Sequence, residues 1–265
     1  MLMAVKNNLR FFKNSLITNL KSVLAYKTMF VIQAGLMFVN NLLFITIWLN
    51  IFENAKTDLI TFDEILGLNA ICALSYGVTY FFFGGVWYIN RYIVDCTLDS
   101  YLLQPKNVLL NVILSKCDFS AFGDIISGIF LSLVICKYDF TKALGLIMFG
   151  IFSSIFFIST EIILRSISVW IGDTSKLSER YLHTLLTNFS SYPESIFPKW
   201  IRVLLYTIIP SGFVSYLPLE IFYEFSVIKI LIYIFVGILY LMLAIVVFNR
   251  AIKSYDSGNA INLKI

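Results

Sequence analysis

The ionisable residues inside the apolar runs of this chain are the first candidates for chemistry. Asp124, Glu161 and Arg165 fall within stretches that are oily enough to cross a membrane. A charge at the bilayer centre costs about 2.5 to 3.5 kcal/mol on insertion scales, so each of them needs a partner or water. Glu161 and Arg165 have the spacing and order at which two side chains on one helix pair. They form either the polar lining of a substrate path or a structural lock, whereas Asp124 is close enough to the start of its run to reach cytosolic water.

The usual catalytic and metal-binding patterns are missing from the sequence. His183 is the only histidine, and the cysteines, Cys72, Cys96, Cys117 and Cys136, form no C-x-x-C pair. They predict neither a metal site nor a disulfide framework, and small unreactive thiols are the expected state. The sequence has no G-x-x-x-x-G-K-[ST] phosphate loop either, so ATP hydrolysis by that route is excluded. We expect no catalytic residue, no metal and no cofactor bound by this chain.

Composition places the chain in a membrane. Hydrophobic residues make up 59% of its 265 residues and charged residues 14%, whereas about 25% of an ordinary soluble domain is charged. This length has room for about six spans of ~20 residues with their loops. The formal net charge of +4 is too small and too scattered to indicate nucleic acid. We therefore expect an all-α polytopic membrane protein that forms one domain over residues 1–265.

Six apolar runs are predicted to span the membrane. Their bounds are 28–52, 65–88, 121–136, 144–170, 201–217 and 230–248. Basic residues cluster outside these runs or at their edges, at Lys6, Arg10, Arg91, Lys106, Lys116, Lys176, Arg180, Lys199, Arg202, Arg250 and Lys253, whereas the loop 53–64 has Lys56 alone. The positive-inside bias therefore predicts that both termini and the basic segments are cytoplasmic and that 53–64 lies outside.

Two further features modify this simple pattern. Residues 1–27 have apolar residues three and four apart with Lys and Arg on other faces, which predicts an amphipathic helix at the headgroup boundary. The alternative is a basic segment that only sets topology. In the fifth run and directly after it, Pro210, Gly212 and Pro218 interrupt any straight helix. Irregular backbone at membrane depth needs protein or a water-filled cavity around it, so this is a candidate outer kink, re-entrant segment or gate.

The polar stretch between the second and third runs has helical periodicity of its own. Its apolar residues recur at spacings of three to five, its two acids are one turn apart, and a proline ends it; these are Ile93, Leu98, Tyr101, Leu102, Asp95, Asp99 and Pro105. This pattern predicts a short amphipathic helix outside the bilayer. Such a helix either docks another protein or rests on the lipid headgroups.

The same stretch resembles a family pattern. Ile93 to Pro105 resembles "I-x-x-G-x-L-D-x-x-L-x-R-P" of a bacterial ABC-2 type permease family, with Cys96 in place of the glycine and Gln104 in place of the arginine. Two later segments extend the resemblance along the chain: Tyr192 to Pro198, continuing to Pro210 and Pro218, and Tyr255 to Gly258.

This resemblance implies the membrane half of an exporter in the bacterial cell membrane. Two such permeases, the same or different chains, pair with two ATPase subunits that bind ATP and Mg. In the family the helix between spans two and three couples to the ATPase, and the substrates include drugs, antimicrobial peptides and other amphiphiles. Transport then proceeds by alternating access. The alternative is a non-transporting scaffold or immunity protein that binds a peptide; a self-powered carrier is less favoured because no inverted repeat is apparent.

Overall fold

The computed structural model describes residues 2–55, 61–172 and 184–255 of the chain. Every regular element in these residues is a helix, so the predicted all-α class is confirmed for them. The first half contains α1 (Leu2–Ala25), α2 (Lys27–Ala55), α3 (Phe62–Phe83), η1 (Gly84–Tyr88), α4 (Ile89–Val94), α5 (Asp99–Leu102), α6 (Val108–Ile113) and α7 (Ala121–Ile135). The second half contains α8 (Phe140–Ser166), α9 (Ser168–Ile171), α11 (Thr184–Ser191), η3 (Glu194–Ile196), α12 (Lys199–Thr207), η4 (Gly212–Tyr216), α13 (Leu217–Tyr223) and α14 (Val227–Ser254).

Local sequence explains where the long helices begin. The hydroxyl of Thr61 accepts a hydrogen bond from the Glu64 amide at 3.2 Å, which caps the N-terminus of α3. The Asp139 carboxylate accepts hydrogen bonds from the amide of Thr141 at 3.0 Å and from its hydroxyl at 2.6 Å at the start of α8. These bonds lower the pKa of Asp139 below its usual value, with the hydroxyl bond as the main cause. Both helices therefore begin at a polar residue that satisfies free backbone amides.

Four helices of the described residues are long and apolar enough to cross a membrane. They overlap the predicted runs at 28–52, 65–88, 144–170 and 230–248, beginning one to four residues earlier, and correspond to α2, α3 with its extension to Val94, α8 with α9, and α14. The run at 121–136 forms the shorter helix α7. The run at 201–217 does not form a straight span, because α12 and the η4–α13 segment are bent by 82° relative to each other. Counting that bent pair as one span gives up to five candidates, compared with the six runs predicted.

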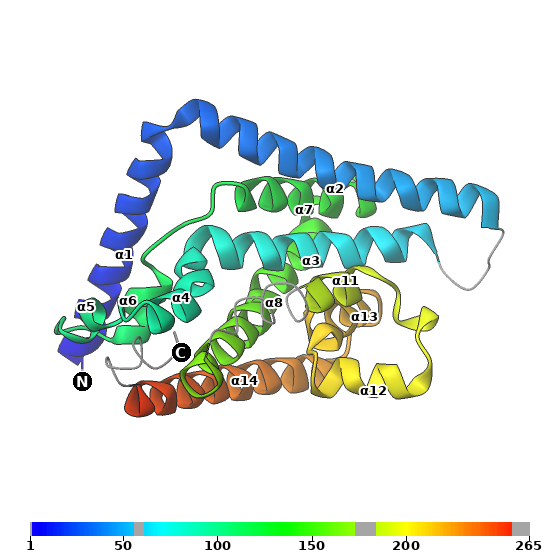
Figure 1. Cartoon of the computed structure of the whole chain (residues 1–265). Helices are drawn as coiled ribbons and strands as arrows, with labels where there is room; N and C mark the ends of the chain where they lie inside the picture. The colour runs from blue at the N-terminus through cyan, green and yellow to red at the C-terminus, as the bar shows by residue number, and fades with distance from the viewer. Residues whose placement is uncertain (1, 56–60, 173–183, 256–265) are drawn as a thin grey trace.

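Helices α3 and α8 form the centre of the molecule, packed on each other and on α7 (Figure 1). In their most apolar windows, 72% and 61% of the residues are buried, whereas the values for α2 and α14 are 11% and 17%. Glycine permits the close approach of α3 and α7, because a Cβ atom at Gly77 would lie 2.8 Å from the backbone nitrogen of Ile125. The outer helices α2 and α14 therefore carry most of the surface that faces outward from the core.

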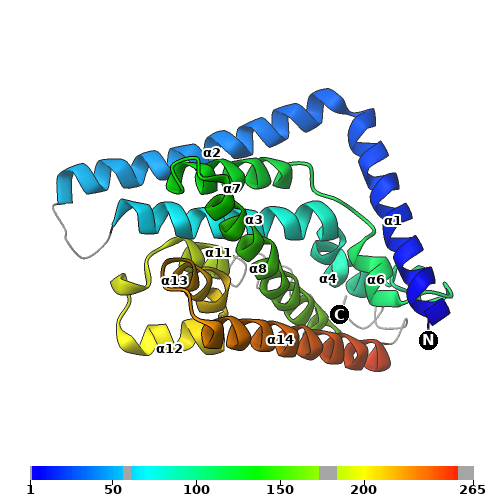
Figure 2. The same ribbon diagram turned by 180° about the vertical axis from the view of Figure 1, so that it is seen from behind.

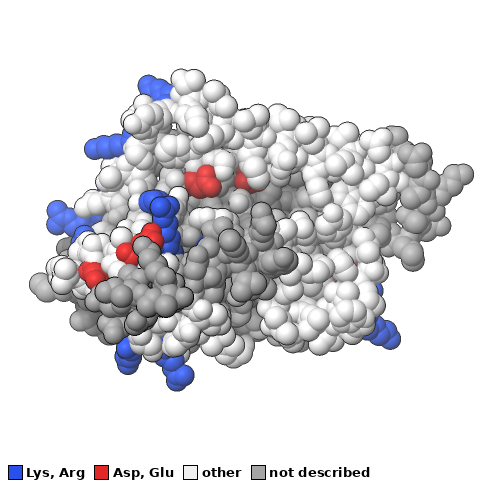
Figure 3. All heavy atoms as spheres, in the orientation of Figure 1, with Lys and Arg blue, Asp and Glu red and all other residues white. Residues whose placement is uncertain are grey.

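The molecule has two distinct ends, seen from opposite sides in Figures 1 and 2. The basic end contains α1, α4 to α6 and the C-terminal part of α14, and most of the Lys and Arg side chains visible in Figure 3 gather there. The far end contains the end of α2, the start of α3, α12 and α13. Helix α9 packs against α4 and α14, so the chain is still at the basic end at Ile171.

One predicted side assignment is wrong. The ring of Tyr192 lies 5.7 Å from that of Trp48 near the end of α2, and Glu194 lines a cavity of about 460 Å³ together with Thr61 and Glu64. The chain has therefore changed ends between Ile171 and Tyr192, and the segment from 192 to 202 shares the far end with the loop predicted to lie outside.

Lys199 and Arg202 cannot be cytosolic if residues 53–64 are outside. The positive-inside count failed here because it assigns a side to each segment from the number of spans that precede it, whereas contacts between distant residues decide which end of the molecule the segment reaches. Lys176, Arg180 and His183 lie outside the described residues.

Candidate functional site

The predicted docking helix at 93–105 is two short helices joined by a turn. Helix α4 ends at Val94, α5 begins at Asp99, and Cys96 between them has a backbone φ of 54°. This left-handed conformation suits glycine better than a residue with a Cβ atom. It explains why the family pattern has glycine at the position of Cys96. The prediction of one continuous amphipathic helix was therefore incorrect.

The apolar residues of this segment pack into the chain's own core. Leu98 and Ile93 are 1% and 6% exposed, in one cluster with Val112 and Phe248. Tyr101 is partly buried with its ring 5.1 Å from that of Tyr92. These side chains fix the segment to the molecule, and a partner could not contact Leu98.

The exposed edge of the segment comes directly after α5. Leu103 is 87% exposed, and Gln104, Pro105 and Lys106 are exposed with it. Asp95 is also exposed and forms a 3.2 Å ion pair with Arg91. Asp99, by contrast, is only partly exposed. The surface available to a partner therefore contains one large apolar side chain among polar ones.

Several contacts hold this edge in place. The amide of Gly85 donates to the carbonyl of Lys116 at 3.1 Å, and the ammonium of Lys116 lies 3.6 Å from the centroid of the Tyr88 ring. Asn111 donates through Nδ2 to Oε1 of Gln104 at 2.8 Å. A Cβ atom at Gly85 would collide with the backbone of α6. The segment is thus a rigid projection of the α3–α7 connection.

Two segments distant in sequence also contact this projection. Lys106 places its ammonium 4.2 Å from the ring centroid of Phe11 in α1, and Asn19 of α1 donates to the carbonyl of Leu114 at 3.0 Å. Tyr255 packs on the same core cluster. Burial raises the pKa of Tyr255, and the nearby Asp99 and Cys96 add to the shift. Tyr255, the described residue of one segment that carries the family resemblance, therefore meets the segment Ile93 to Pro105 at the basic end.

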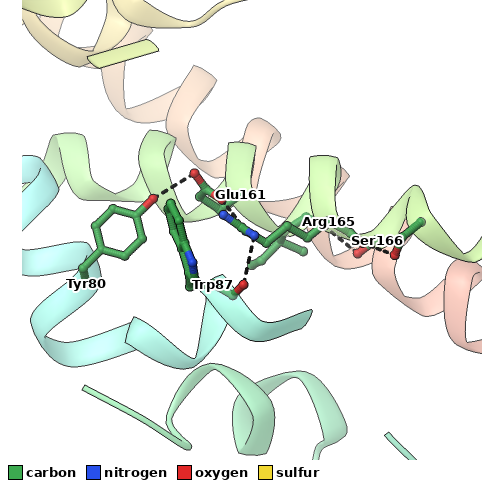
Figure 4. A network of polar contacts seen from close by, with 7 residues as sticks. Tyr80, Trp87, Glu161, Arg165 and Ser166 are labelled. Carbon is green, nitrogen blue, oxygen red and sulfur yellow. Dashed lines mark hydrogen bonds and ion pairs between the residues drawn. The ribbon is translucent and has the colours of Figure 1, made fainter. Parts of the chain in front are cut away.

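The predicted pair of Glu161 and Arg165 is present and buried (Figure 4). Arg165 Nε donates to Glu161 Oε2 at 2.6 Å, and both side chains are almost completely inaccessible. Tyr80 donates to the other carboxylate oxygen at 2.8 Å, while Arg165 Nη1 donates to the carbonyl of Trp87 at 2.9 Å. The guanidinium carbon also lies 4.2 Å from the Trp87 ring centroid. The pair therefore joins α8 to α3 and η1, a geometry that fits a structural lock better than the lining of an open path.

The predicted outer break is a bend at the far end. Pro210 and Gly212 lie at the 82° bend between α12 and α13, and a Cβ atom at Gly212 would lie 2.5 Å from the Tyr206 ring. Pro218 lies in the first turn of α13, directly after the η4 segment. Their role as a gate stays a prediction.

A polar cavity between α2, α3, α7 and α11 was not predicted. It has a volume of about 290 Å³, and its lining includes Asn40, Asn41, Asn69, Asp124 and Thr187. Asp124 is 2% exposed, so it does not reach water in the way its place in the sequence suggested. The sequence held one signal for this cavity, since Asn40 and Asn41 are adjacent polar residues in an otherwise apolar run.

Comparison with known proteins agrees with the resemblance of the sequence. A family described as ABC-2 family transporter protein matches residues 34–258, which is most of the chain. No curated protein and no solved structure matches it. The matched range includes the projection at the basic end, the buried pair and the far-end bend. This chain belongs to the ABC-2 family of transporter proteins, a family of membrane components without a nucleotide-binding domain.

Proposed function

We propose that this chain is the permease subunit of an ATP-driven exporter, powered by separate ATPase subunits that carry ATP and Mg. The observation that carries this proposal is the rigid projection at the basic end, which exposes Leu103 while Leu98 anchors it in the core. A segment so firmly held can transmit a displacement of a bound partner to α3 and α7. The cytoplasmic position of this end, and of both termini, in a bacterial cell membrane is part of the proposal.

The mechanism we propose is alternating access. Closure of the ATPase dimer on ATP would move the projections of two paired permeases, and the spans would shift between inward-facing and outward-facing states. The second permease is a copy of this chain or a homologous one. The largely exposed apolar faces of α2 and α14 supply surface for it and for lipid. The substrate class we propose is an amphiphile.

Disruption of the exposed edge tests this proposal. The chain is co-expressed with a candidate ABC ATPase subunit, and retention of the ATPase is measured after detergent extraction. Leu103→Asp should lower the ATPase affinity at least tenfold, because truncating or charging a contact in the centre of an interface costs about 2 kcal/mol or more. Ile196→Asp, at a 49% exposed apolar residue of η3, is the matched control. Equal retention by both variants would refute docking at this edge.

A second measurement addresses the source of energy. The isolated chain should show no ATPase activity, and the complex with its partner should show activity that Leu103→Asp reduces together with export. Hydrolysis by the isolated chain, with contaminating ATPases excluded, would contradict the assignment.

A further inference from the structure

The cavity beside α2 contains a buried carboxylate that the fold leaves partly unsatisfied. Asp124 Oδ1 accepts a hydrogen bond from Asn41 Nδ2 at 2.7 Å, and the same amide nitrogen lies 2.8 Å from Ser127 Oγ. Among the residues that the structure describes, Oδ2 has no hydrogen-bond partner although it is buried. A buried polar atom normally has a partner, so an unsatisfied oxygen at a cavity wall indicates a position for a ligand donor.

The surroundings of Asp124 favour a cation as that ligand. The lining of the cavity includes amide and hydroxyl side chains but, in the described part of the chain, neither lysine nor arginine. Asp124 lies in the first turn of α7, where the helix dipole favours a negative charge. As far as its described lining goes, the site thus combines one carboxylate with neutral hydrogen-bonding groups and supplies no positive charge of its own. An ammonium group would neutralise the carboxylate and donate the hydrogen bond that Oδ2 lacks.

The apolar part of the lining suits an amphiphile rather than a small inorganic ion. Met37, Phe44, Ala73 and Tyr76 line the same cavity as Asp124. The described residues also include no group of three or more acidic, histidine or cysteine side chains that could hold a metal ion. Ligand sites that combine apolar walls with a few convergent polar groups are typical for small organic molecules.

The position of the cavity in the fold fits a route along the spans. Asn41 is in the middle of α2, about 21 Å from either end at about 1.5 Å per residue. A second cavity of about 330 Å³ shares Tyr76 with the first and extends to Gln33, Trp87 and Lys116 near the basic end. Figure 3 shows acidic side chains in the hollow of this face. The two cavities therefore lie in series between the basic end and the middle of the spans.

We propose that this cavity binds the protonated amine of an amphiphilic substrate, with Asp124 as its counter-ion and Asn41 as the residue that orients the carboxylate. This inference rests on the proposed transport function and specifies its substrate class. It is tested on the isolated chain, so that a negative result here leaves docking of the ATPase untouched, and failure of docking leaves this result standing.

The test compares two fluorescent probes that differ in one charge. The full chain in nanodiscs of zwitterionic lipid is titrated with dansylcadaverine, which carries a primary ammonium, and with its neutral N-acetyl derivative, and empty nanodiscs are subtracted. We expect dansylcadaverine to bind at least tenfold more tightly than the acetyl derivative. Asp124→Asn should abolish that preference, whereas Asp118→Asn, at an exposed carboxylate of the neighbouring cavity, should retain it.

Equal affinity of the two probes for the unmodified chain, or a preference that survives Asp124→Asn, would overturn the proposal. A second readout needs no variant. Dicyclohexylcarbodiimide modifies carboxyl groups in apolar surroundings, and mass spectrometry measures its addition to Asp124. Dansylcadaverine should slow this modification at least fivefold and the acetyl derivative should not; equal modification rates with both probes would also refute the site.

Discussion

Two buried carboxylates of this protein have opposite surroundings. Glu161 is held by Arg165 at 2.6 Å and by Tyr80 at 2.8 Å, in a packed part of the core. Asp124 is also buried, but it has one amide partner and faces a cavity of about 290 Å³. In a low-dielectric interior a charge is tolerated when it is compensated, and the first site achieves this with the chain's own groups. The comparison teaches that burial alone does not distinguish a structural charge from one that awaits a ligand.

The largest effect is expected from removing the cation of the compensated site. Arg165→Met should lower the free energy of unfolding by about 3 to 5 kcal/mol, because it leaves the Glu161 carboxylate buried without a counter-charge. Unfolding in mixed micelles of dodecyl maltoside and dodecyl sulfate measures the change. The control is Lys229→Met, which removes a 2.7 Å ion pair with Glu220 at a more exposed site and should lower the free energy of unfolding far less, because solvent screens an exposed pair. Similar losses in the two variants would mean that the buried pair is not a lock.

Removing both charges of the pair should lower the free energy of unfolding by less than the sum of the losses from the two single substitutions. We expect Glu161→Gln with Arg165→Met to be no less stable than Arg165→Met alone, since the second substitution removes the uncompensated carboxylate. The coupling free energy should be about 0.5 to 3 kcal/mol in the same unfolding assay. Strictly additive losses would show that each residue acts through other contacts.

A smaller loss of stability is expected when Tyr80, the third residue of the hydrogen-bond network, loses its hydroxyl. Tyr80→Phe keeps the ring, whose centroid lies 5.6 Å from that of Trp87, and removes the hydroxyl that donates to Glu161. The cost should be about 1 to 2 kcal/mol, because one hydrogen bond to a charged group is lost. Tyr26→Phe, at a 68% exposed residue, should change stability by less than about 0.5 kcal/mol. If Tyr80→Phe matches this control, the network reduces to the ion pair.

The smallest change in stability is expected at the other carboxylate. Asp124→Asn keeps a side-chain oxygen for Asn41 and removes a charge that has no counter-ion among the described residues. The free energy of unfolding should therefore change by less than about 1 kcal/mol, and an increase is within expectation. A loss as large as that of Arg165→Met would make Asp124 structural and would remove the contrast between the two sites.

Helix spacing in the sequence predicted the Glu161–Arg165 site better than the Asp124 site. Glu161 and Arg165 are one helical turn apart, so their pairing follows from helix geometry once the run is helical. The contribution of Tyr80 comes from 81 residues away, and no spacing in the sequence encodes it. The cavity around Asp124 requires four helices to converge, which periodicity within one run cannot reveal.

In the segment at 93–105, too, the sequence predicted one feature and contacts with distant residues decided another. Its sequence predicted correctly that an apolar face exists on a short helical piece between two spans. The structure decided what covers that face, because Leu98 and Ile93 pack under Val112 and Phe248 while Leu103 is left exposed. Amphipathic periodicity identifies a face that seeks burial but not the partner that provides it.

The sequence by itself determined the all-helical membrane class and the approximate positions of the four long apolar helices. The bilayer imposes these features locally, since each spanning segment must be apolar over its length and must satisfy its own backbone hydrogen bonds. Only the tertiary structure decided that residues 192–202 lie at the far end, that α12 and α13 bend by 82°, and that Asp124 faces a cavity. These outcomes depend on which helices pack together, and that choice is made by contacts between residues far apart in the chain.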